Sequence, residues 1–180
     1  RPRLVAEAHP EPERGADDRA EVDRQWDVFE ERAGKTRAPV FYVGGNHDLL
    51  GAKLQQAWGD RLGPSYYHFV YKDTLFLVLD TEDHSPERLA EMAELRRQAF
   101  RIADERGWDA FDETDYAKLP ENPAGNISAE QSAYFLEAIA ANPEVRHTFL
   151  FMHKAPWLRE DLETFATIEA ALADRPYTVF

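Results

Sequence analysis

The chain has 180 residues, a formal net charge of −13 and no cysteine. Its length and its 43% hydrophobic content allow one domain with a real core and argue against disorder. The negative charge disfavours nucleic acid as a partner, because a polyanion would be repelled. The absence of cysteine excludes disulfides and thiolate metal sites, so a transition metal would need His, Asp, Glu or Asn ligands. No stretch reaches the roughly 18 apolar residues of a membrane segment.

The first 45 residues predict one helix and one strand. Residues 1–20 are rich in Pro and charged side chains, and they indicate a loose arm. Residues 19–33 carry apolar side chains at helical spacing and predict an amphipathic helix that ends at Gly34. The apolar run 40–43 is interpreted as a short buried strand that leads into Gly44 and Gly45.

The middle of the chain predicts a hairpin followed by a long excursion. The stretch "YYHFVYKDTLFLVLD" (66–80) suits two strands joined by a tight turn at Lys72 and Asp73. Residues 75–79 are apolar throughout, which is typical of a strand buried on both faces. Residues 86–106 suit a long charged helix. Residues 107–127 are rich in Gly, Pro, Asp and Asn, so we expect a helical and loop excursion over about 84–127.

The last third predicts a helix, a strand, a helix and a final strand. Ser128 and Gln131 form the pattern S-x-x-Q, which favours the start of a helix that stops near Asn142. The run 148–152 is expected to be a strand, residues 160–173 a helix, and "PYTVF" at the end another strand. The whole pattern predicts an α/β fold in one domain, residues 1–180.

Polar side chains follow three of the predicted strands. They are Asn46, His47 and Asp48 after residues 40–43, Asp80 after residues 75–79, and His153 after residues 148–152. In open α/β sheets, ligands bind at the carboxyl ends of the strands, so neighbouring strands would bring these groups to one crevice. Two glycines before Asn46 would permit unusual backbone angles and close approach to a ligand.

These residue types suit metal and proton chemistry. An imidazole and a carboxamide oxygen are uncharged metal ligands, and an aspartate can fix the tautomer of a histidine. A histidine can also donate a proton to a leaving oxygen. For Asp80 we favour the simpler interpretation, a carboxylate that caps a turn.

The polar motifs resemble those of the calcineurin-like metallophosphoesterase family. "GNHD" (45–48) matches the family signature G-N-H-[DE], and "FLFMHKAPW" (149–157) resembles the next motif, an apolar strand ending in a metal-binding histidine. "PYTVF" is similar to the strand that precedes the closing G-H-x-H motif. The resemblance covers residues 22–180.

The resemblance implies a fold of two stacked mixed β-sheets flanked by helices. It also implies two divalent metal ions (Mn, Fe or Zn), with Asn46 and His153 as ligands of the second. His47 would contact the phosphate and protonate the leaving group, and Asp48 would orient His47. The metals would hold the phosphate and activate a bridging hydroxide. The substrate would be a phosphate-ester small molecule or a phosphoprotein.

The sequence also departs from the family pattern. The opening D-x-H and G-D-x-x-D motifs are missing, and "EAH" (7–9), the nearest imitation, lies too close to Asn46. The closing G-H-x-H is missing too, so we expect a partial domain that is truncated at both ends. A non-catalytic binding or scaffold domain with an incomplete metal site is the alternative. A different α/β hydrolase is disfavoured, because the chain has no G-x-S-x-G motif and no cysteine.

Four further residues receive interpretations. His68 and His147 are interpreted as surface or packing residues. His84 could line the cleft, but we favour a place in a solvated loop. Trp157, four residues after His153, is the aromatic side chain that we expect to touch a substrate.

Overall fold

The computed structural model describes residues 18–180, and the chain divides into two compact units, Arg1–Val40 and Phe41–Phe180. In the first unit, α1 (Arg19–Ala33) begins where the Asp18 side chain accepts a hydrogen bond from the Ala20 N–H, and it ends at Gly34. The predicted amphipathic helix is therefore confirmed. Residues 1–17, which include the "EAH" stretch and most of the predicted arm, lie outside the described residues.

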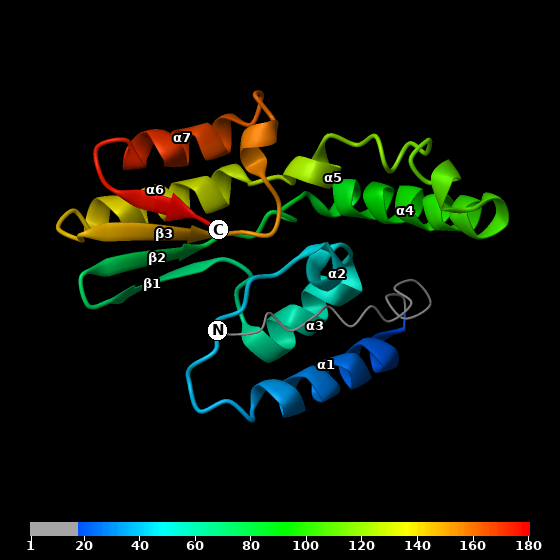
Figure 1. Cartoon of the computed structure of the whole chain (residues 1–180), viewed down its shortest axis with the longest axis horizontal. Coiled ribbons are helices and arrows are strands. Elements are labelled where there is room, and N and C mark those ends of the chain that lie inside the picture. Colours follow the sequence, from blue (N-terminus) through cyan, green and yellow to red (C-terminus); the bar gives the residue numbers. More distant parts are fainter. Residues whose placement is uncertain (1–17) are drawn as a thin grey trace. The chain divides into compact units, whose positions relative to one another are not determined.

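The second unit holds the remaining elements (Figure 1). In chain order they are α2 (Asn46–Leu49), α3 (Ala52–Leu62), β1 (Tyr67–Tyr71), β2 (Thr74–Val78), α4 (Pro86–Arg106), η1 (Trp108–Ala110), α5 (Glu121–Ala124), α6 (Ala129–Ala141), β3 (His147–Phe151), η2 (Pro156–Leu158), α7 (Glu163–Leu172) and β4 (Tyr177–Val179). The predicted hairpin, the two long helices and the last two strands are all present.

One mixed sheet organises this unit. Its strand order is β1-β2-β3-β4, with β1 antiparallel to β2 and with β2, β3 and β4 parallel to one another. Leu77 of β2 pairs with Leu150 of β3, which fixes the register across the centre. The α/β class is confirmed. Residues 18–180 contain a single four-stranded sheet, so the second stacked sheet stays a prediction.

The strand predicted over residues 40–43 is wrong for the described structure, which assigns no strand there. The segment instead contacts β1 through side chains. The ring of Phe41 stacks on that of Phe69 with centroids 4.2 Å apart, and the Tyr67 hydroxyl donates to the Tyr42 carbonyl at 2.9 Å. Phe41 is 55% exposed, so the run is not the buried strand that its composition suggested. Instead, the apolar side chain of Phe41 in this segment packs against the β1–β2 hairpin through its ring contact with Phe69.

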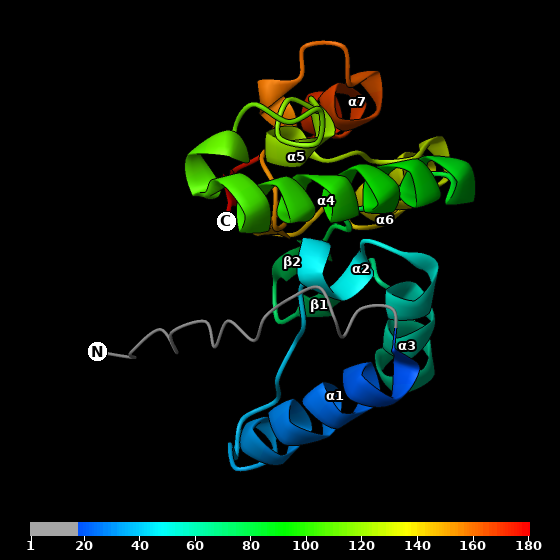
Figure 2. The same cartoon turned by 90° about the vertical axis from the view of Figure 1, so that its right-hand side faces the viewer.

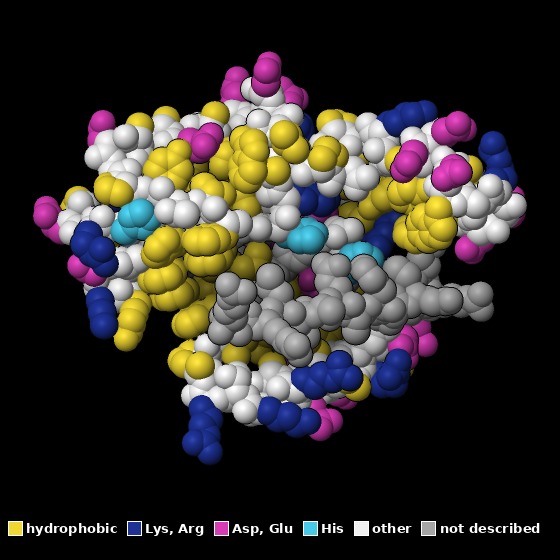
Figure 3. Space-filling model, viewed as in Figure 1, with side chains coloured by type: hydrophobic (Ala, Val, Ile, Leu, Met, Phe, Trp, Pro, Cys, Tyr) yellow, Lys and Arg dark blue, Asp and Glu magenta, His cyan; other side chains and the backbone are white. Residues whose placement is uncertain are grey.

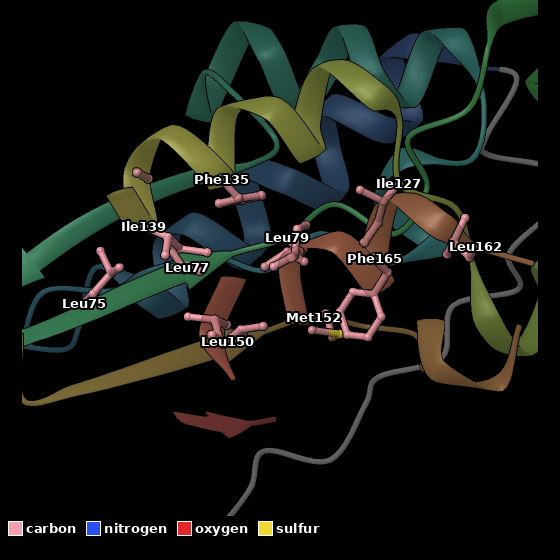
Figure 4. Close-up of a cluster of buried hydrophobic side chains, with 13 residues drawn as sticks. Leu75, Leu77, Leu79, Ile127, Phe135, Ile139, Leu150, Met152, Leu162 and Phe165 are labelled. Carbon is pink, nitrogen blue, oxygen red and sulfur yellow. The ribbon is translucent and has the colours of Figure 1, made fainter. Parts of the chain in front are cut away.

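The main core lies between the sheet and helices α6 and α7 (Figure 4). Leu77 and Leu150 project from β2 and β3, and they meet Phe135 of α6 and Phe165 of α7. Each of these four side chains is at most 2% exposed, and burying one such side chain stabilises the fold by about 1.5–3 kcal/mol. This core holds the carboxyl ends of β2 and β3 next to each other.

The opposite face of the sheet is aromatic. Phe69 stacks on Phe76 at 4.7 Å between ring centroids, Phe76 contacts Phe149 at 5.5 Å, and Phe151 stacks on Phe180 at 5.0 Å. Hydrophobic side chains gather over the strands in Figure 3. The rings thus form a continuous apolar surface across the strands.

The predicted excursion is a helical arm. Helix α5 lies beside α4 (Figures 1 and 2), and Arg88 of α4 donates to Glu121 of α5 at 2.8 Å. In a second small core, Leu89, Met92 and Tyr116 of this arm pack together with Leu50, which directly follows α2. None of the described helices has both the length and the apolar character that crossing a membrane requires.

Candidate functional site

The "GNHD" motif forms a one-turn helix. Gly45 precedes α2, and its N–H donates to Asp48 Oδ2 at 2.9 Å, so the carboxylate closes the turn. Burial raises the pKa of Asp48, while the Gly45 hydrogen bond and the nearby His153 act in the opposite direction. His47 is exposed on this turn. The orientation of His47 by Asp48 stays a prediction.

The structure brings Asn46 and His153 into contact. Asn46 Oδ1 lies 2.9 Å from His153 Nε2, although the two residues are 107 positions apart. Asn46 opens α2, and His153 follows β3 by two residues. The sequence predicted that these side chains meet. Their role as metal ligands stays a prediction.

Close packing explains why positions 44 and 45 are occupied by glycine. Neither has a positive φ, and Gly45 is extended at φ −113°, so the predicted need for unusual backbone angles is wrong. A Cβ atom on Gly45 would lie 3.1 Å from three ring atoms of His153. A Cβ on Gly44 would lie 2.4 Å from Leu49 Cδ1. The close approach is therefore to protein side chains, and Gly45 lets the imidazole of His153 reach Asn46.

The spacing of this pair suits a shared cation. Two ligands at about 2.1 Å from a metal and at right angles to each other are about 3 Å apart. The 2.9 Å between Asn46 Oδ1 and His153 Nε2 meets that requirement. Among residues 18–180, no group of three or more His, Asp or Glu side chains is placed to hold a metal ion. The same 2.9 Å is also the length of a hydrogen bond between the two side chains, so their role as ligands of one cation stays a prediction.

A buried ion pair lies next to this contact. Glu82 is 0% exposed, and its Oε1 lies 2.5 Å from Nζ of Lys154, the residue after His153. Lys154 Nζ also donates to the Glu121 carbonyl at 3.1 Å. Burial raises the pKa of Glu82, and Lys154 offsets part of that effect. Sequence reasoning missed this pair, because Glu82 and Lys154 lie 72 positions apart and neither directly follows an apolar strand.

His84 belongs to the same buried cluster, so its assignment to a solvated loop is wrong. Its side chain is 2% exposed, and its Nε2 lies 3.9 Å from Glu82 Oε2. Burial and the positive charge of Lys154 lower the pKa of His84 to about 4. An isolated parallel β-bridge pairs the backbone at Glu82, two residues before His84, with the backbone at Asn126. His84 also lines a cavity of about 250 Å³ together with Asp80 and Asp83.

The cap interpretation of Asp80 is confirmed. Its Oδ1 accepts from the Glu82 N–H at 2.7 Å, and its own N–H donates to Gln131 Oε1 at 3.0 Å. The S-x-x-Q pattern is only half a capping box. Ser128 Oγ accepts from the Gln131 N–H, but the Gln131 amide donates to Asp80 and Asp83 instead of returning to Ser128.

The other histidines have packing partners, as predicted. His68 Nδ1 lies 2.7 Å from the Tyr134 hydroxyl, and His147 Nε2 lies 2.9 Å from Thr178 Oγ1. Both rings are half-buried. Trp157 is mostly exposed, and its contact with a substrate stays a prediction.

A second residue that the sequence did not reveal is Arg96 of α4. Its Nη2 lies 3.3 Å from Nδ1 of His47, and the residue is only 8% exposed. It sits in a helix dense with charged residues, where nothing in the spacing distinguishes it from its neighbours. The excursion therefore contributes a cation to the candidate site.

The chain matches no protein-family model, no curated protein and no solved structure. Its function therefore has to be inferred from the site itself.

Proposed function

We propose that this chain is a metal-dependent phosphoesterase that hydrolyses a phosphomonoester or a phosphodiester through a two-metal centre. The observation that supports the proposal is the 2.9 Å contact between Asn46 Oδ1 and His153 Nε2, with the exposed His47 next to Asn46 in the chain. In this proposal the Asn46–His153 contact supplies two uncharged metal ligands, and His47, the next residue after Asn46, supplies a proton donor.

Each residue has a defined task in this proposal. Asn46 and His153 hold one divalent cation, and the bound cations neutralise phosphate charge and stabilise the charge that develops during hydrolysis. His47 contacts a phosphate oxygen and donates a proton to the leaving oxygen. Asp48 keeps the turn closed through the Gly45 N–H and orients His47. A chain of net charge −13 needs such cations to attract an anionic ester.

We infer a fold of two stacked sheets for the same domain. The face of the sheet opposite α6 and α7 carries the half-buried rings of Phe69, Phe76, Phe149 and Phe151. Sandwich proteins bury such an apolar face against a second sheet. The aromatic face is the feature that supports this arrangement.

A non-catalytic binding or scaffold domain is the second candidate. One observation favours it: residues 18–180 contain no group of three or more His, Asp and Glu side chains that could hold a metal ion. The two candidates differ in a measurable property, because a scaffold needs neither metal binding nor His47.

Metal binding provides the first test. Mn²⁺ is titrated into the 180-residue chain, and the free ion is followed by electron paramagnetic resonance. We expect N46A and H153A each to weaken Mn²⁺ binding by more than about tenfold, as loss of a ligand or its support does. H147A, which removes a histidine bonded to Thr178, should bind Mn²⁺ like the parent. A parent chain that binds no Mn²⁺ would contradict the proposal.

Hydrolysis provides the second test. A chromogenic phosphate ester is supplied with Mn²⁺, and H47A is compared with the parent. Loss of a general acid should lower the rate about 10²–10⁴-fold while Mn²⁺ binding is retained. If H47A hydrolyses the ester at the parent rate, the role given to His47 is wrong.

A further inference from the structure

Arg96 contacts the histidine that the proposed function uses as a proton donor. Its Nη2 lies 3.3 Å from His47 Nδ1, and its guanidinium carbon lies 5.7 Å from the centroid of the Phe100 ring. Arg96 is 8% exposed, so its charge is largely withdrawn from solvent. A buried cation that meets one nitrogen of an exposed imidazole constrains that ring.

The direction of the hydrogen bond follows from the chemistry of arginine. A guanidinium has five N–H donors, no acceptor, and stays protonated in proteins. In the contact with Arg96, His47 Nδ1 must therefore be the acceptor. A neutral imidazole carries one proton, so in His47 that proton resides on Nε2. Nε2 is separated from Nδ1 across the ring, and its N–H is directed away from Arg96.

A buried anion, Glu82, lies near Arg96. Glu82 is fully buried, and the guanidinium of Arg96 is near enough to help lower its pKa. The same carboxylate lies 2.5 Å from Lys154, which follows His153 in the chain. Glu82 thus forms an ion pair with the residue after His153 and interacts electrostatically with the cation that contacts His47.

We propose that Arg96 is a positioning residue that holds His47 as the Nε2–H tautomer. The use of that proton rests on the proposed function: its transfer to the leaving oxygen would leave His47 as an imidazolate, whose negative charge the Arg96 guanidinium at Nδ1 would balance. The tautomer itself does not depend on that function. The helical excursion then belongs to the site, because α4 supplies the group that decides which nitrogen of His47 can donate.

The tautomer can be read directly by nitrogen NMR of the chain labelled with ¹⁵N-histidine, in the absence of metal. In the parent, we expect His47 to show a bare Nδ1 and a protonated Nε2. R96M removes the donor and keeps a long unbranched side chain. We expect it to lower the ratio of Nε2–H to Nδ1–H tautomers about tenfold, the usual value of a charge-assisted hydrogen bond.

Two further variants control this experiment. R97M changes the next residue of α4, which pairs with Glu94, and should leave the His47 signals as in the parent. R96K restores a charged donor and should recover part of the tautomer ratio. A parent chain with the proton on Nδ1 of His47 would overturn the proposal even if R96M fails to fold. Equal tautomer ratios in folded R96M and R97M would overturn it as well.

Kinetics separate this inference from the proposed function. With the chromogenic ester, R96M should lower kcat about tenfold and leave KM near the parent value, because the donor proton is used in the transition state. If the parent hydrolyses no ester but shows the expected tautomer shift in R96M, the proposed function fails and the positioning role stands. If H47A is inactive while R96M keeps the parent tautomer and kcat, the positioning role fails alone.

Discussion

Replacing His84 by Gln should make the stability of the chain less dependent on pH between about 6.5 and 4. In the folded chain, burial and Lys154 lower the pKa of His84 from 6.5 to about 4. The unfolded chain takes up a proton at His84 near pH 6.5, whereas the folded chain resists it until about pH 4. Between about pH 6.5 and pH 4 the unfolded state therefore binds more protons at His84 than the folded state. The contribution of His84 to the free energy of unfolding decreases as the pH falls through this range.

The expected magnitude follows from the size of the shift. One pKa unit corresponds to about 1.4 kcal/mol, so the displacement of the His84 pKa from 6.5 to about 4 corresponds to roughly 3 kcal/mol. Because the His84 side chain is only 2% exposed, solvent screens little of this effect. Asp80 and Glu82 act with the opposite sign, since burial raises the pKa of both carboxyl groups.

The measured quantity is therefore the difference in the free energy of unfolding between the parent and H84Q. Urea unfolding of the parent and of H84Q, followed by tryptophan fluorescence, gives the free energy of unfolding at half-unit steps from pH 4 to 8.5. The contributions of Asp80 and Glu82 are largely common to both curves. Any packing change caused by glutamine adds an offset that does not vary with pH.

The difference between parent and H84Q should be flat above about pH 7.5 and should change by roughly 3 kcal/mol down to about pH 4, with the parent losing more stability. Parallel curves over the whole range would refute the reasoning. They would show that His84 is protonated equally well in both states, and hence that the cluster with Glu82 and Lys154 does not exclude its charge.

Two further predictions concern the residues that bring the site together. G45A should place a methyl group 3.1 Å from the His153 ring, cost about 1–3 kcal/mol of unfolding free energy, and weaken Mn²⁺ binding. Mn²⁺ binding equal to that of the parent would count against this packing role. K154M should cost about 3–5 kcal/mol, because it removes the cation that forms an ion pair with the buried Glu82 carboxylate. The double variant E82Q/K154M should recover part of that loss in urea unfolding, and simply additive losses would show that the pair is not coupled.

The sequence predicted the features that depend on local chemistry. Helix α4 was recognised from its composition and spacing, and β1 and β2 from two apolar runs around a turn at Lys72. The meeting of Asn46 and His153 was predicted because both follow apolar runs that were taken to end at a common edge. The predicted contact is present in the structure, although one of the two strands on which the prediction rested is not, because residues 40–43 do not form a strand.

The sequence did not reveal the features that depend on distant partners. Glu82 and His84 looked like ordinary loop residues, because only the fold brings Lys154 to them from 70 or more positions away. Arg96 is one of several arginines in α4, and its contact with His47 is decided by how the excursion folds back. A buried charge is recognisable only when its partner is known, and a single sequence does not supply that pairing.

The order in which the chain is made also bears on the site. Asn46 and His153 are 107 positions apart, and between them the chain completes β1, β2, the whole helical arm, α6 and β3. Contacts of such long sequence separation form late in folding, because loop closure must be completed before they are gained. A growing or partly folded chain therefore exposes an isolated asparagine and an isolated histidine, and the contact between Asn46 and His153 exists only once the parallel strands have closed.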